Sequence, residues 1–181
     1  MMTSRSFTIE GIVLKRSNLG ETDRLVTLLT QEQGKIACVA KGVRKLNSSK
    51  SSYMEPANII KAHLIRTKSI PLLVQATLVQ DSCPAKDGLC QIRQLTQILE
   101  IYDKLFVEEE IARETFNLVL QIRQALMIQE KNKIRYNLGQ LLLQLGYPAP
   151  DLSKYTSVLE YVQEIAERPM KSFEYLQVKN T

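Results

Sequence analysis

The pattern of hydrophobic and polar residues divides the chain into two parts with different periods. In the first 80 residues, short segments alternate between apolar and polar positions or form brief apolar runs, which is typical of β-strands. We expect five strands, at residues 7–15, 25–30, 35–43, 59–65 and 72–79. Their connections are short, and an open sheet would leave long unprotected edges, so we predict a small closed barrel.

Two local features refine the predicted barrel. Gly11 interrupts the first strand and is expected to mark a bulge or a bend. In the third strand, Ile36, Cys38 and Ala40 fall on one face. Residues 44–52 are polar, rich in serine and basic, which indicates an exposed loop after that strand.

After Pro84–Gly88 the hydrophobic period becomes helical. Apolar residues recur every three or four positions in four segments, at residues 92–106, 111–126, 134–145 and 158–166. Gly146 and Pro148 mark the end of the third segment. The acidic run Glu108–Glu110 suits the start of the second helix, because carboxylates stabilise helix N-termini. The prediction is therefore an α+β protein, with a five-stranded barrel at residues 1–80 and a helical bundle at residues 81–181.

Length and composition exclude several classes of protein. The 181 residues are 44% hydrophobic and 24% charged, enough for a core that needs no disulfide or metal. No apolar run reaches the roughly 18 residues of a membrane-spanning helix, and no signal peptide is visible. Cys38, Cys83 and Cys90 form no CxxC pair, so we expect buried thiols in a reducing cytoplasm.

Charge is unevenly distributed along the chain. The net charge is +5 and the pI is about 9.1. Residues 1–80 carry twelve basic and five acidic side chains, whereas residues 81–181 carry twelve and fourteen. This asymmetry suggests two modules with different partners, with nucleic acid as the partner of the first.

Basic residues concentrate around the predicted third strand. No acid lies between Gln33 and Met54, and five basic residues do: Lys35, Lys41, Arg44, Lys45 and Lys50. Lys15, Arg16 and Arg24 precede this stretch. Small five-stranded barrels bind oligonucleotides over the second and third strands and the flanking loops. Phe7 and Tyr53 are the only aromatic residues in the first 80, so phosphate contacts should dominate and single and double strands should both be accepted.

The residues offer little for catalysis. His63, the only histidine, falls within a predicted strand, and there is no Walker-type phosphate loop. Glu21 and Asp23 are the only candidates for holding Mg²⁺ in a nuclease, and no third carboxylate accompanies them in a recognisable motif. The chain is therefore not expected to be an enzyme.

Several sequence blocks, taken in order, resemble the bacterial recombination and repair mediator family RecO. These are Gly11–Leu14, Gly20–Leu25, Gly34–Lys35, Ala40–Lys45 and, in the helical part, Leu145–Leu152. The resemblance covers about residues 7–155. It implies an N-terminal OB-fold, a five-stranded barrel, followed by a helical domain.

The resemblance also implies a function and its partners. RecO-like proteins bind single- and double-stranded DNA and anneal complementary strands. With RecR they help load RecA onto DNA coated by single-strand-binding protein, whose acidic C-terminal tail docks on the helical domain. The family pattern falls on Lys35, Lys41, Arg44 and Lys45, which we expect to bind DNA with support from Lys15, Arg16, Arg24 and Lys50. Gly34 and Gly42 are expected to serve turns or close backbone approaches, and Arg93, Arg113 and Arg123 are candidates for the acidic tail.

The chain also departs from the family pattern. Many members carry a zinc-binding cysteine cluster where this chain has Tyr155 and Val158, so we expect no zinc and no other cofactor. The chain also ends earlier than most members. An alternative function is an OB-fold adaptor that binds RNA or a ribosomal component, which would prefer RNA and would not anneal DNA strands. The expected location is the bacterial cytoplasm, in association with the nucleoid.

Overall fold

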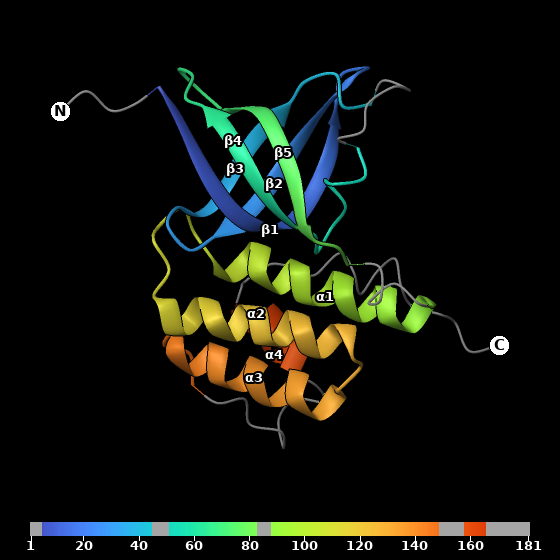
Figure 1. Cartoon of the computed structure of the whole chain (residues 1–181). Coiled ribbons are helices and arrows are strands. Elements are labelled where there is room, and N and C mark those ends of the chain that lie inside the picture. The colour runs from blue at the N-terminus through green and yellow to red at the C-terminus, as the bar shows by residue number, and fades with distance from the viewer. Residues whose placement is uncertain (1–4, 45–50, 83–87, 149–157, 166–181) are drawn as a thin grey trace. The chain divides into compact units, whose positions relative to one another are not determined.

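The computed structural model describes residues 5–44, 51–82, 88–148 and 158–165 (Figure 1). The predicted site residues Lys45 and Lys50 lie outside these ranges, as do Cys83 and Tyr155. Contacts divide the chain into two compact units. The first unit contains Met1–Ser82 together with Phe106–Ile111, and the second contains Cys83–Leu105 and Ala112–Thr181.

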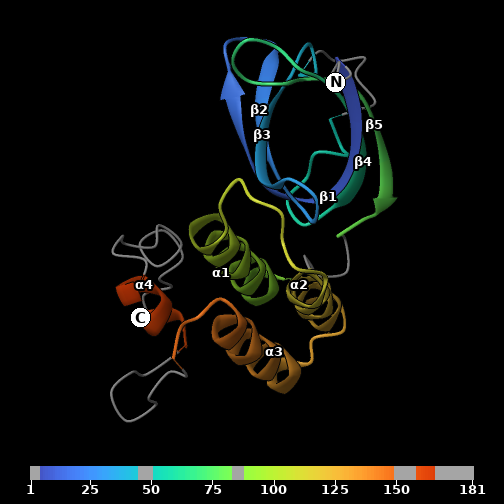
Figure 2. The ribbon, with the colours of Figure 1, turned by 90° about the vertical axis from the view of Figure 1, so that its left-hand side faces the viewer.

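The first unit is built on five strands that pair in the order β1-β2-β3-β5-β4 and close into a barrel (Figure 2). The strands are β1 (Ser6–Leu19), β2 (Asp23–Thr30), β3 (Gly34–Ala40), β4 (Ile59–Ile65) and β5 (Leu72–Gln80). Neighbouring strands are antiparallel except β3 and β5, which pair in parallel through Val39 with Leu72 and Ala40 with Leu73. The predicted α+β class, with five strands followed by helices, is confirmed.

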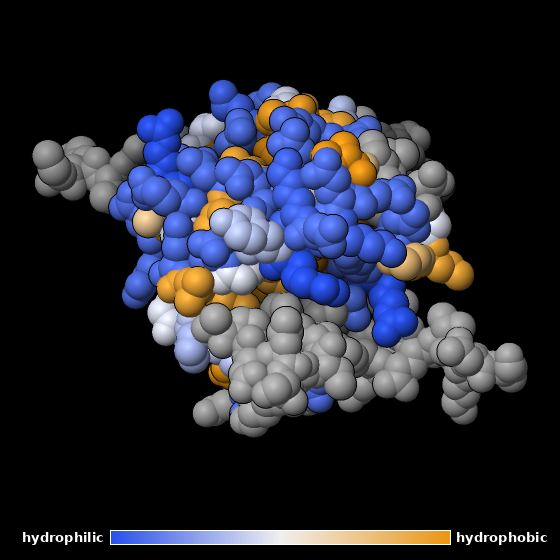
Figure 3. Space-filling model, turned by 90° about the horizontal axis from the view of Figure 1, so that it is seen from below, coloured by the Kyte–Doolittle hydropathy of each residue, from blue (hydrophilic) through white to orange (hydrophobic). Residues whose placement is uncertain are grey.

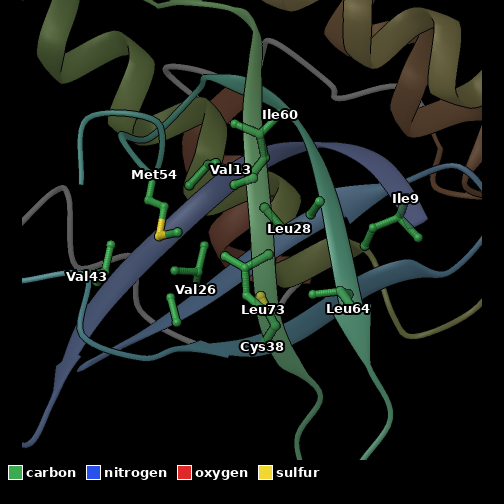
Figure 4. Packing of buried hydrophobic residues seen from close by; sticks show 13 residues of the cluster. Ile9, Val13, Val26, Leu28, Cys38, Val43, Met54, Ile60, Leu64 and Leu73 are labelled. Atoms are coloured by element: carbon green, nitrogen blue, oxygen red, sulfur yellow. The ribbon is translucent and has the colours of Figure 1, made fainter. Parts of the chain in front are cut away.

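The inward-facing side chains form one hydrophobic core (Figure 4). Its most deeply buried side chains, which are essentially inaccessible to solvent, come from β1, β2 and β4 and include Val13, Val26, Leu28, Ile60 and Leu64. The predicted face of the third strand is also found, since Cys38 and Ala40 belong to this core and Ile36 packs against it. Burial raises the pKa of the Cys38 thiol to about 12, as expected of an inert buried cysteine.

Gly11 does not mark the predicted bulge. The register of β1 against β2 shifts between Val13 and Lys15, whereas Gly11 pairs regularly with Thr30 and with Ile60. A Cβ at Gly11 would lie 2.6 Å from the Thr30 methyl group and 2.7 Å from the Leu29 carbonyl oxygen. The glycine is needed because the two strands approach closely there, not because the strand bulges.

Residues Phe106–Ile111, here called the strap, belong to the barrel unit although they follow the first helix. The Lys35 N–H donates to the Val107 carbonyl at 2.8 Å, and the Ile111 N–H donates to the Gln31 carbonyl at 2.8 Å. Phe106 and Ile111 are buried. The expectation that Glu108–Glu110 begin a helix is therefore wrong, because hydrogen bonds to the β2–β3 hairpin hold these residues in the strap.

The second unit contains four helices in its described residues. They are α1 (Leu89–Leu105), α2 (Arg113–Met127), α3 (Lys131–Gln144) and α4 (Val158–Ile165). The predicted stripes supply its buried side chains, including Leu99, Val119 and Leu141. The Tyr102 hydroxyl joins α1 to α2 by donating to the Val119 carbonyl at 3.4 Å.

One face of the molecule can be followed in a space-filling view. The face seen from below is mostly hydrophilic, and its hydrophobic residues form small separate patches (Figure 3). Cys90, which was expected to be buried, is exposed on α1. None of the helices seen in the described ranges is both long enough and apolar enough to span a membrane.

Candidate nucleic-acid interface

The tip of the β1–β2 hairpin is hydrogen-bonded to the segment that follows β3. The Asp23 carboxylate accepts from the Gly42 N–H at 2.8 Å and from the Thr22 hydroxyl at 2.9 Å. The Arg44 N–H donates to the Thr22 carbonyl at 3.0 Å, and the Arg44 guanidinium donates to the Gly20 carbonyl at 3.0 Å. Gly20 and Gly42 have φ angles of 63° and 64°, in the left-handed region that favours glycine, and for Gly42 this confirms the expected turn. These bonds hold Lys41 and Arg44 beside the hairpin.

Two further arginines, Arg16 and Arg24, lie on the two strands of the same hairpin. Arg16 and Arg24 are half-buried, and both contact the segment before β4. Arg16 forms an ion pair with Glu55, and the Arg24 guanidinium donates to the Ser51 hydroxyl at 3.3 Å. Burial lowers the pKa of Arg24, and the charges of Arg16 and Arg44 lower it further, while Glu55 partly offsets them. The arginines are thus close enough to repel one another.

We call Arg16, Arg24, Lys41 and Arg44 the hairpin surface. Lys41 and Arg44 are its exposed members, and Lys41 forms no hydrogen bond or ion pair with the part of the chain that the structure describes. Lys15 is exposed on β1 one residue before Arg16, so its side chain points to the opposite face of the strand. The four cations of this surface outnumber the nearby carboxylates of Glu21, Asp23 and Glu55, and a surface of net positive charge attracts polyanions.

Lys35 does not belong to this surface. It lies at the other end of β3, six residues before Lys41, which corresponds to about 20 Å along a strand. Its backbone is bonded to the strap, whose Glu108, Glu109 and Glu110 are exposed. The structure therefore brings four of the predicted residues together and separates Lys35 from them.

The β4–β5 connection, residues 66–71, lies beside the end of β3. The Val39 N–H donates to the Pro71 carbonyl at 2.9 Å, next to the two pairs that join β3 to β5. Both ribbon views show the β1–β2 hairpin, the end of β3 and the β4–β5 connection along one rim of the barrel (Figures 1 and 2). Arg66 and Lys68 therefore share a rim with the hairpin surface. Sequence reasoning missed this, because a parallel pairing between distant strands leaves no local signal.

The predicted candidates in the helical unit differ in accessibility. Arg113 is exposed at the start of α2, and Arg93 is half-buried on α1. Arg123 is only 6% exposed on α2. A tail arriving from solvent cannot reach it, so the expectation for Arg123 is wrong: the residue lies among the interior side chains of this unit.

Comparison with known proteins shows which family the N-terminal part of the chain resembles. Residues 2–81 match the family model described as recombination protein O N terminal. Over these residues the chain is similar to the N-terminal part of RecO proteins. Proteins named DNA repair protein RecO from a Nocardioides species, Bifidobacterium adolescentis and Bacillus velezensis are 36%, 34% and 33% identical to it. The alignments cover 55%, 65% and 62% of this chain but 41%, 48% and 44% of those relatives, so the chain spans about half their length.

The structure shows what the RecO-like blocks do in this chain. The block around Asp23 and the block around Gly42 are the two partners of the hairpin-to-β3 hydrogen bonds. The block at Gly146 ends α3. There the Gly146 N–H donates to the Leu143 carbonyl and the Tyr147 N–H donates to the Leu142 carbonyl, both at 3.0 Å, with Gly146 at φ 85°. This is a Schellman motif, in which glycine supplies the left-handed residue after the helix.

Proposed function

We propose that this chain is a DNA repair and recombination mediator. It binds single- and double-stranded DNA and anneals complementary strands. Together with RecR, it helps load RecA onto single-stranded DNA coated by single-strand-binding protein. The observation that carries the proposal is the hairpin surface, where Asp23 and its hydrogen-bond partners hold Lys41 and Arg44 beside two more arginines. The relatives' name, DNA repair protein RecO, supports the same role.

The proposed mechanism is electrostatic and not catalytic. The barrel acts as an OB-fold whose basic rim contacts phosphates, and contacts of that kind accept any sequence. Two single strands repel each other through their phosphates, and cations on the rim reduce that repulsion. The bases remain available to find their complements. Because Asp23 already accepts two hydrogen bonds within the rim, we assign it a structural role and not metal binding.

The helical unit is proposed to contact the protein partners. An acidic tail, such as that of single-strand-binding protein, would pair with an exposed cation, and Arg113 on α2 is the accessible candidate among the three arginines considered. The proposed place of action is the bacterial cytoplasm, at the nucleoid.

The test is annealing of complementary fluorescent oligonucleotides across a salt series. The variant Lys41→Glu/Arg44→Glu changes two exposed side chains of the hairpin surface. The control Lys131→Glu/Lys133→Glu makes the same charge change on α3, where both lysines are also exposed. We expect wild type and control to accelerate annealing and the hairpin variant to lose most of that acceleration.

Salt dependence provides a second readout. Each phosphate neutralised on a single strand contributes about −0.7 to the slope of log affinity against log salt concentration. Removing two cations should therefore reduce the slope by about 1.4. A folded wild-type protein that does not accelerate annealing at low salt would refute the mediator function, and stronger binding of RNA than of DNA would instead favour an RNA adaptor.

A further inference from the structure

A cation–aromatic stack lies at the start of β1 and the end of β4. The Arg66 guanidinium carbon is 4.4 Å from the centre of the Phe7 ring. The ring is partly buried and packs against the barrel core, and the Arg66 N–H donates to the Arg5 carbonyl at 2.8 Å. Arg66 itself is exposed. One side of the guanidinium thus lies against the Phe7 ring, in a residue that is exposed to solvent as a whole.

The residues around this stack are positively charged. Arg5, Arg66 and Lys68 are all exposed, and the β4–β5 connection contains no acid. The connection has an ordered shape, because the Thr67 hydroxyl donates to the Ile70 carbonyl at 2.9 Å and accepts from the Ser69 N–H at 3.2 Å. We call Arg5, Phe7, Arg66 and Lys68 the stacking patch.

A backbone hydrogen bond links the β4–β5 connection, which carries part of the stacking patch, to the end of β3, which leads into the hairpin surface. Pro71, at the end of the β4–β5 connection, accepts a hydrogen bond from Val39 at 2.9 Å. Lys41 of the hairpin surface follows Val39 by two residues. A nucleic-acid strand on the rim can therefore run from one set of cations to the other.

We propose that the stacking patch is a contact for unpaired bases. A base stacks on the side of the Arg66 guanidinium opposite Phe7, and Arg5 and Lys68 contact the neighbouring phosphates. Unstacked bases of single strands are recognised on aromatic rings and on arginine planes, whereas bases inside a duplex are already stacked on one another. This inference rests on the proposed function and adds to it a site that distinguishes single from double strands.

Such a contact suits an annealing protein. A single strand is held both by its phosphates and by a base on Arg66. When that base pairs with its complement it leaves the guanidinium, so the duplex product keeps only the phosphate contacts. The product is then bound less tightly than the substrate, which favours its release.

The experiment measures binding of the full chain to three labelled DNAs of equal length by fluorescence anisotropy. These are single-stranded oligothymidine, a single strand of abasic sites and a duplex. The variant Arg66→Lys keeps the charge but removes the planar group. Arg135→Lys is the matched control, because it makes the same change at an exposed position on α3 that lies outside the stacking patch and the hairpin surface.

We expect Arg66→Lys to weaken binding of oligothymidine about fivefold or more, the lower end of one base-stacking contact. Its binding of the abasic strand and the duplex should stay within about twofold of wild type, and Arg135→Lys should leave all three unchanged. If Arg66→Lys binds oligothymidine as tightly as wild type does, the base-stacking inference is refuted while the proposed function stands. A protein partner would then be the better explanation of the patch. An equal loss on all three DNAs would also overturn it. A wild type that binds no DNA would refute the proposed function and this inference together.

Discussion

Gly34 is the position where the strap depends most directly on a single residue. It has a φ angle of 59°, and a Cβ added there would lie 2.1 Å from the Glu109 carbonyl oxygen and 2.4 Å from the Val107 carbonyl oxygen. Both are backbone atoms, so no side-chain rotation relieves the collision. In Gly34→Ala, either the β2–β3 turn or the strap must move.

The cost of that movement follows from what the strap contributes. A left-handed residue with a Cβ costs about 1–2 kcal/mol. Displacing the strap weakens two backbone hydrogen bonds, worth about 1 kcal/mol each. It also exposes Phe106 and Ile111, each buried at about 1.5–3 kcal/mol. Because the strap can shift without leaving the barrel completely, we expect Gly34→Ala to lower the free energy of unfolding by about 3–5 kcal/mol.

The variant Gly20→Ala is a control that measures the cost of a left-handed alanine without a steric collision. Gly20 has nearly the same φ angle, 63°, but a Cβ there would meet nothing within 4 Å. This variant should lose only about 1–2 kcal/mol. Urea unfolding followed by far-ultraviolet circular dichroism measures both variants, and limited proteolysis should cleave the strap faster in Gly34→Ala alone. If Gly34→Ala is no less stable than Gly20→Ala, the strap does not pack on Gly34 as described.

Three further predictions concern other parts of the chain. Asp23→Ala should destabilise the protein by about 1–2 kcal/mol in urea unfolding, because the Gly42 N–H loses its acceptor, and Asp23→Asn should recover most of this since it keeps an oxygen. Cys38 should resist thiol reagents at pH 8 while exposed Cys90 reacts, because burial raises the Cys38 pKa to about 12; labelling of Cys38 in the native protein, detected by mass spectrometry, would contradict this. The same shift makes the protein less stable above about pH 9, where the unfolded thiol ionises and the folded one does not. Gly146→Ala should cost about 1 kcal/mol in thermal unfolding, since its φ of 85° disfavours a Cβ although nothing crowds it.

The elements of the fold were largely predictable because their signals are local. The alternation through Ile36, Cys38 and Ala40 identified a face of β3 that does pack in the core. The glycine and proline after Leu145 identified the end of α3. In each case the period or the turn residue lies within the element that it specifies, so no knowledge of the tertiary structure was required.

Predictions failed where a residue is explained by a partner distant in sequence. Gly11 looks like a bulge along its own strand, but its reason is the close approach of Thr30. Glu108–Glu110 resemble a helix start, but hydrogen bonds to Gln31 and Lys35 place their segment on the barrel. A local pattern records what a residue favours, whereas these positions are decided by which strand or turn lies opposite.

The same distinction explains why the candidate site was only partly predictable. Sequence proximity grouped Lys35 with Lys41, yet β3 separates them by about 20 Å, more than two Debye lengths at physiological ionic strength. Lys35 therefore adds little to the field at the hairpin surface. It also lies beside the strap, where the exposed Glu108–Glu110 oppose a polyanion. Lys41, Arg44 and Arg66 thus lie on one rim of the barrel, whereas the exposed acids of the strap lie near the β2–β3 turn. Under the proposed function, this charge separation would direct a nucleic-acid strand to the rim that holds Lys41, Arg44 and Arg66.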